Sequence, residues 1–95
     1  MLDERVRILK ALAHPVRLRI VEFLRDGEKC VCEIIPHLNA DQPLVSQHLS
    51  VLRNAGILDF EKRGNRIFYR LSNEKILEIL RILDEMVERE VVRKI

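Results

Sequence analysis

The stretch that decides the fold runs from Asp41 to Leu71 and reads DQPLVSQHLSVLRNAGILDFEKRGNRIFYRL. It begins with a good helix N-cap residue and continues with apolar residues at helical spacing, until Gly56 ends the helix. Two β-prone runs, residues 57–61 and 66–71, then flank the turn sequence Lys62-Arg63-Gly64-Asn65. The stretch therefore predicts a helix followed at once by a β-hairpin.

Basic charge is concentrated on this hairpin. The whole chain has a formal net charge of +2, but residues 57–71 carry four basic side chains against two acidic ones. A helix over residues 42–55 beside a basic hairpin is the layout of a winged helix-turn-helix, whose helix enters the DNA major groove while the hairpin follows the backbone. The pattern predicts a DNA-binding protein that contacts phosphates through the hairpin.

The segments before this unit are expected to form three supporting helices. Helical spacing predicts helices over residues 3–13, from Pro15 to Gly27 and from Val31 to Leu38. Pro36 is expected near the first turn of the third helix, where a missing N–H costs little. The second helix is expected to direct three arginines outward, namely Arg17, Arg19 and Arg25.

The last predicted helix begins near Ser72 or Asn73 and continues almost to Ile95. Its apolar residues sweep more than half of the helix circumference, whereas one stripe suffices for a helix that lies on its own domain. These positions are Ile76, Ile79, Leu80, Ile82, Leu83, Met86, Val87 and Val91. The excess width predicts a second partner, most simply the same helix of another subunit. We expect one mostly α winged helix-turn-helix domain over residues 1–95, with five helices and a two-stranded wing, that forms a homodimer through its terminal helices.

The composition argues against other classes of protein. No apolar run approaches the ~18 residues of a membrane span, and no charged-then-apolar leader is present, which predicts a soluble cytoplasmic chain without membrane contact. The chain has only three glycines, no phosphate-binding glycine loop and no nucleophile–base motif, so an enzyme is not expected. Its two cysteines are only one residue apart, a poor spacing for a structural disulfide, which predicts reduced thiols.

Three motifs occur in order along the chain: ALAHPVRLRIVEFLRDGEKCVCEI, QPLVSQHLSVLRNAGIL and GNRIFYRL. Together they resemble the ArsR/SmtB family of winged-helix transcriptional repressors, and the resemblance covers about residues 9–71. It implies a homodimeric repressor of double-stranded operator DNA that leaves the operator when an inducer binds. Two alternatives stay open, namely a repressor without a small-molecule inducer and a winged helix used for protein–protein contact.

The predicted DNA-contacting residues lie on the helix over residues 42–55 and on the hairpin. On the helix they are Gln42, Leu44, Ser46, Gln47 and, more obliquely, His48 and Ser50, and on the hairpin they are Arg63, Asn65 and Arg66. Glutamine suits paired hydrogen bonds to adenine, serine contacts bases or phosphates, and arginine at a hairpin tip can rest on phosphates. Small polar residues on a helix face are often merely solvated, but the adjacent basic hairpin favours DNA contact.

Cys30-Val31-Cys32 matches the Cys-Val-Cys signature of the resembled family, at the start of the helix before the recognition helix. Thiolates at a helix N-terminus have a lowered pKa and are soft ligands, which suits As(III), Cd(II), Pb(II) or Zn(II) as an inducer. Residues two apart on an ideal helix are about 200° apart around its axis, so both sulfurs cannot face one ion without unwinding. Such unwinding is expected to shift the recognition helix.

The thiol pair does not form a complete site of the family. Arsenic-sensing members carry a third cysteine at the position of Ile35, and the last helix lacks the histidines of the zinc- and nickel-type site. His37 is the candidate third ligand beside Cys30 and Cys32. Sensing of a metal or metalloid, sensing of thiol oxidation, and two purely structural cysteines stay open as interpretations.

Overall fold

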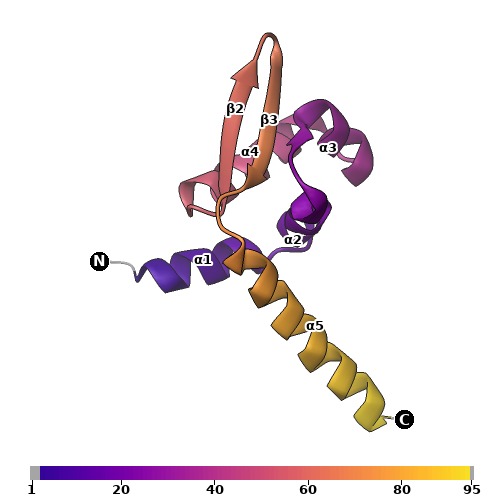
Figure 1. The fold of residues 1–95 in the computed structure, drawn as a ribbon. Helices are drawn as coiled ribbons and strands as arrows, with labels where there is room; N and C mark the ends of the chain where they lie inside the picture. Colours follow the sequence, from indigo (N-terminus) through magenta and orange to yellow (C-terminus); the bar gives the residue numbers. More distant parts are fainter. Residues whose placement is uncertain (1–2, 95) are drawn as a thin grey trace.

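The computed structural model describes residues 3–94, and its side chains are described as far as residue 88. Figure 1 shows a body of short helices, a hairpin that projects from one side and a long helix that leaves the other. The elements are, in order, α1 (Glu4–Leu12), α2 (Pro15–Phe23), the 3₁₀ turn η1 (Leu24–Asp26), β1 (Lys29–Cys30), α3 (Val31–Leu38), α4 (Gln42–Asn54), β2 (Leu58–Arg63), β3 (Arg66–Leu71) and α5 (Lys75–Lys94). The predicted helices and hairpin are confirmed.

Local chemistry sets the ends of α2. His14 is its N-cap residue, and the Nδ1 atom of His14 accepts a hydrogen bond from the backbone N–H of Val16 at 3.1 Å. Pro15 follows as the first helical residue, where its missing N–H leaves no bond unmade. The regular helix ends at Phe23, and η1 leads to Gly27, whose φ of 131° favours glycine.

The turn between α3 and α4 also follows the sequence closely. Asn39 ends α3 in the left-handed conformation, with φ 51°. Asp41 occupies the predicted N-cap position of α4 with extended backbone angles, although its side chain makes no capping hydrogen bond. Pro36 differs from the prediction, since it is the sixth residue of α3 and not part of the first turn. The helix begins at Val31, as predicted, and Pro36 therefore lies in its interior.

The sheet has three strands in the order β1-β3-β2, so the predicted two-stranded wing is incomplete. Strands β2 and β3 pair antiparallel from Leu58↔Leu71 to Arg63↔Arg66 around a Gly64-Asn65 turn. Strand β1 adds two residues to the other side of β3, pairing Lys29↔Tyr69 and Cys30↔Phe68. A strand of two residues has no periodicity that sequence patterns can detect. The pairing joins the cysteine segment directly to the wing.

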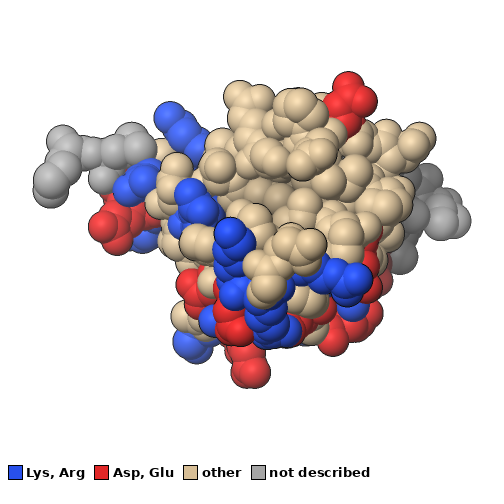
Figure 2. Space-filling model, turned by 90° about the horizontal axis from the view of Figure 1, so that it is seen from above, with Lys and Arg blue, Asp and Glu red and all other residues tan. Residues whose placement is uncertain are grey.

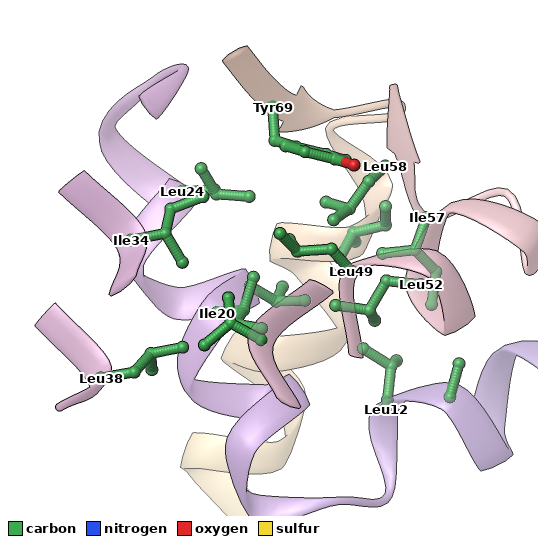
Figure 3. Close-up of a cluster of buried hydrophobic side chains, with 14 of the residues drawn as sticks. Leu12, Ile20, Leu24, Ile34, Leu38, Leu49, Leu52, Ile57, Leu58 and Tyr69 are labelled. Atoms are coloured by element: carbon green, nitrogen blue, oxygen red, sulfur yellow. The ribbon is translucent and has the colours of Figure 1, made fainter. Parts of the chain in front are cut away.

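One apolar core holds the helices and the base of the wing together. Figure 3 shows Tyr69 and Leu58 from the hairpin above Leu49 and Leu52 of α4, with side chains of α2 and α3 beside them. The buried cluster comprises Ala11, Leu12, Ile20, Val21, Leu24, Ile34, Leu38, Val45, Leu49, Leu52, Ile57, Leu58, Tyr69, Ile76 and Leu80. Because α4 and the hairpin share this core, their relative orientation is fixed by packing.

Only the first part of α5 packs on the body. Ile76 and Leu80 are buried, whereas Ile82, Leu83, Met86 and Val87 are 42–62% exposed. Figure 1 shows α5 extending away from the other elements. Val91, part of the predicted apolar surface, lies outside the residues whose side chains are described. No helix in the described chain is long and apolar enough to cross a membrane.

Candidate nucleic-acid interface and thiol pair

The two sides of α4 differ sharply in chemistry. Its inner side buries three apolar residues, Val45, Leu49 and Leu52. Its outer side exposes Gln42, Leu44, Ser46 and Gln47, while Ser50 is half-buried. Arg53 is the single charged residue among residues 42–54. The helix thus offers hydrogen-bonding side chains with little charge.

The surface seen from above the wing divides in the same way. Figure 2 shows a broad uncharged area beside a run of Lys and Arg side chains, with acidic groups along its edge. Helix α4 packs against strand β2, so the side chains of α4 and the cations of the wing lie on adjoining elements. Such an arrangement can read bases through the helix and neutralise phosphates through the wing.

His48 does not belong to this outer face, and the prediction that it is presented there is wrong. Only 7% of its surface is exposed. Its ring lies 4.4 Å from the ring of His14, centroid to centroid, and its Nδ1 atom is 3.2 Å from Nη1 of Arg17. Position 48 follows Val45 by three residues and so turns toward the inner side of α4. The pKa of His48 is lowered mainly by burial and to a smaller extent by repulsion from His14 and Arg17.

Arg17 connects α4 to the preceding helices, in contrast to its predicted outward direction. Its Nε atom donates to the carbonyl of Ala11 at 2.6 Å, and its Nη2 atom donates to that of Lys10 at 3.1 Å. Because arginine can only donate, the contact with His48 requires an unprotonated Nδ1 as acceptor. A neutral His48 with its proton on Nε2 therefore completes the link between α4 and the end of α1.

The wing exposes cations near its tip. Asn65 lies in the turn, and Lys62 and Arg66 are exposed at the ends of the two strands. Within the described residues neither Lys62 nor Arg66 has an ion-pair partner. The base of the wing also touches α4, since the Arg53 guanidinium lies 4.8 Å from the Phe60 ring centroid. Lys62 and Arg66 are thus the cations that are free to meet a phosphate.

Arg63 is held by two carboxylates, unlike the free cation that the sequence predicted. Its Nη1 and Nη2 atoms donate to the two oxygens of Glu28 at 2.6 and 2.9 Å, and its Nε atom donates to Glu61 at 2.7 Å. These bonds raise the pKa of Arg63, and the same contact lowers the pKa of Glu61. The guanidinium also lies 4.5 Å from the centroid of the Phe68 ring. Glu28 is far from Arg63 in sequence, so no local pattern indicated the pair.

Cys30 and Cys32 form a disulfide, so the prediction of reduced, separated thiols is wrong. Cys30 is the N-cap residue of α3, with extended backbone angles of φ −70° and ψ 146°, and only Cys32 lies within the helix. The 100° rotation per residue of a helix therefore does not apply between them, and their sulfurs meet without unwinding. The Cys30 sulfur also accepts a hydrogen bond from the N–H of Cys32, while Glu33 accepts one from the N–H of Cys30.

His37 is not brought to the thiol pair. It lies near the other end of α3, where its ring stacks on Phe23 with centroids 3.8 Å apart. Within the described part of the chain, no three side chains of His, Cys, Asp or Glu are grouped closely enough to hold a metal ion. Cys30 and Cys32 are therefore the only two of the predicted ligands that come together.

Comparisons with known proteins agree with this geometry. The family model described as bacterial regulatory protein, arsR family, matches residues 14–59. The chain is 40% identical over 81 residues to the arsenical resistance operon repressor of Escherichia coli K12, covering 84% of this chain and 69% of that repressor. The chain belongs to the ArsR family. This is a family of regulatory winged-helix proteins and not of enzymes.

Further similarities of this ArsR-family chain extend to sequence and structure. It is 42% identical over 80 residues to the transcriptional repressor SmtB of Mycobacterium tuberculosis, and those residues span 84% of this chain but only 59% of SmtB. The homodimeric winged helix-turn-helix DNA-binding domain of Mb0332 from Mycobacterium bovis matches with a TM-score of 0.85 and 26% identity, over 94% of this chain and 82% of that one. The winged helix-turn-helix fold expected from the sequence is confirmed.

Proposed function

We propose that this ArsR-family chain is a homodimeric transcriptional repressor that binds specific double-stranded DNA through α4 and the wing. The observation that carries the proposal is that polar, uncharged side chains on α4 lie beside cations on the adjoining wing. Gln42, Ser46 and Gln47 offer donors and acceptors from a helix locked to the core, and Lys62 and Arg66 offer charge from the wing. This combination suits base reading in the major groove beside phosphate contacts.

The homodimer is proposed from the exposed apolar surface of α5. Four large apolar side chains between residues 82 and 87 are 42–62% exposed. A monomer that leaves such a helix face in water loses the free energy that burial would provide. The same helix of a second subunit covers this face most simply, and pairing places two copies of α4 for two half-sites of the operator.

We propose further that the Cys30–Cys32 pair controls DNA binding through oxidation. Two thiols lose two electrons to an oxidant such as a peroxide and two protons to solvent as the disulfide forms. The joined sulfurs of the two residues favour this interpretation. A thiophilic ion such as As(III), Cd(II), Pb(II) or Zn(II) is the alternative inducer of the reduced pair, and the described residues offer it two sulfurs but no third ligand.

DNA binding is tested by fluorescence anisotropy with duplexes from the region upstream of the chain's own gene. We expect one duplex to bind at least 10³-fold more tightly than a scrambled duplex of the same composition. Equal affinity for both duplexes, or no binding, would refute the repressor proposal. Size-exclusion chromatography with light scattering separately tests the dimer.

The inducer is tested with the same duplex and the fully reduced protein. Peroxide is expected to weaken binding, and dithiothreitol is expected to restore it. Parallel titrations with As(III), Cd(II) and Zn(II) test the metal alternative. Cys30→Ser/Cys32→Ser is the control, and a response of this variant equal to that of the wild type would remove both thiol interpretations.

A further inference from the structure

Arg63 is the most heavily bonded cation of the wing. Glu28 binds it with both carboxylate oxygens, at 2.6 and 2.9 Å, and Glu61 binds the remaining guanidinium nitrogen at 2.7 Å. Paired parallel hydrogen bonds between arginine and a carboxylate are stronger and more directional than a single contact. All three nitrogens of the guanidinium are thus occupied within the protein.

The partner of this arginine lies next to the thiol pair. Glu28 comes two residues before Cys30, and Cys30 pairs with Phe68 across the β1–β3 ladder. The Arg63 guanidinium in turn lies 4.5 Å from the Phe68 ring centroid. The wing is therefore joined twice to residues 28–32, the thiol segment, by a strand pairing at its middle and by an ion pair near its tip.

The bonding of this cluster opposes a role for Arg63 in phosphate binding. Glu28 and Glu61 both bind Arg63, and Glu61 also pairs with Arg70 at 3.7 Å, so the two carboxylates and two guanidiniums are formally neutral together. A DNA phosphate that approached Arg63 would have to displace a bidentate carboxylate that already neutralises it. Arg66, directly opposite Arg63 across the turn, has no such partner within the described chain.

We propose that Glu28 is a positioning residue, which clamps the wing to the thiol segment through Arg63, and that Arg63 does not bind phosphate. This inference rests on the proposed DNA-binding function for its role in repression. According to this proposal, the thiol pair is linked to the wing as well as to the recognition helix. The principal contacts of α3, which begins at the thiol pair, are indeed with α2 and β3.

The first experiment compares the salt dependence of DNA binding for two neighbouring arginines. Each lost phosphate contact lowers the slope of log K against log salt by about 0.9 in magnitude per wing. We expect Arg66→Ala to produce this change and Arg63→Ala to leave the slope unchanged, while its affinity falls a few-fold at every salt concentration. A slope lowered by Arg63→Ala as much as by Arg66→Ala would overturn the proposal.

The second experiment needs no DNA, so it separates a failed clamp from a failed repressor. Hydrogen exchange of the wing amides is measured for Glu28→Gln, Arg63→Ala and the double variant. Each single variant is expected to accelerate exchange at least threefold. The double variant is expected to exchange no faster than Arg63→Ala, because both substitutions remove the same Glu28–Arg63 ion pair. Arg81→Ala, which breaks a 2.7 Å ion pair with Glu85 on α5, is the matched control. Wing exchange unchanged by Glu28→Gln would overturn the clamp.

Discussion

The recognition helix α4 and the wing are held in place by different forces. Helix α4 is anchored by fully buried apolar side chains and by the part-buried contact between Arg17 and His48. The wing is anchored at its base by Tyr69 and Leu58, but toward its tip by strand pairing and by exposed ion pairs of Arg63. Buried packing does not respond to salt, whereas exposed ion pairs do. The part proposed to read bases is thus held by burial, and the part proposed to meet phosphates is held partly by contacts that depend on salt.

The largest expected difference between the two regions lies in stability. Leu49→Ala removes a side chain that is 2% exposed from the inner side of α4, and we expect it to lower the free energy of unfolding by about 3 kcal/mol. Ile67→Ala on the wing, where the side chain is 38% exposed, is the comparison and should cost less than about 1 kcal/mol. Urea unfolding followed by circular dichroism checks both. Equal losses would mean that the wing is packed as firmly as α4.

Base reading should depend on α4 alone. Gln47→Ala is expected to weaken binding to the specific duplex by about 2 kcal/mol, because a glutamine that bonds a base edge loses both of its hydrogen bonds. Binding to a scrambled duplex, and the salt slope, should stay the same. Anisotropy titrations with both duplexes measure the difference. An equal loss of affinity for both duplexes would indicate that Gln47 contacts the DNA backbone and not a base.

Lys62→Ala should give the opposite signature with a smaller loss of affinity. Lys62 is exposed on β2 and has no ion-pair partner in the described chain, so we expect it to contact phosphate. Affinity for specific and scrambled duplexes should fall together, and the salt slope should lose about 0.9 in magnitude per wing. A change in specificity without a change in slope would contradict the division between helix and wing.

The smallest expected effect is a pH dependence of stability that originates at α4. Burial lowers the pKa of His48 below its ordinary value of 6.5, so the unfolded chain binds a proton more readily than the folded one. The contribution of neutral His48 is therefore fully present above pH 6.5 and is lost as the pH falls from there toward the lowered pKa. His48→Gln should flatten the stability curve between pH 7.5 and 5.5, as measured by urea unfolding. An unaltered slope would remove His48 as the titrating group.

Much of the fold was predictable because its signals are local. The His14-Pro15 break, the Asn39 turn and the Gly64-Asn65 hairpin each depend on the backbone preferences of a few adjacent residues. The apolar spacing of α4 likewise predicted which side it buries. The boundary of α3 at Val31 was predicted correctly, but its consequences were not, since it places Cys30 before the helix and Pro36 in its interior.

The sequence by itself determined the winged helix-turn-helix, the polar face of α4 and the concentration of cations on the hairpin. Only the tertiary structure decided which of these side chains are available to a partner. Arg17 meets His48 across 31 positions and Glu28 meets Arg63 across 35, so both pairs arise from the packing of distant segments. The physical reason is that helical and strand periodicity express short-range geometry, whereas the partner of a charged side chain is chosen by three-dimensional proximity.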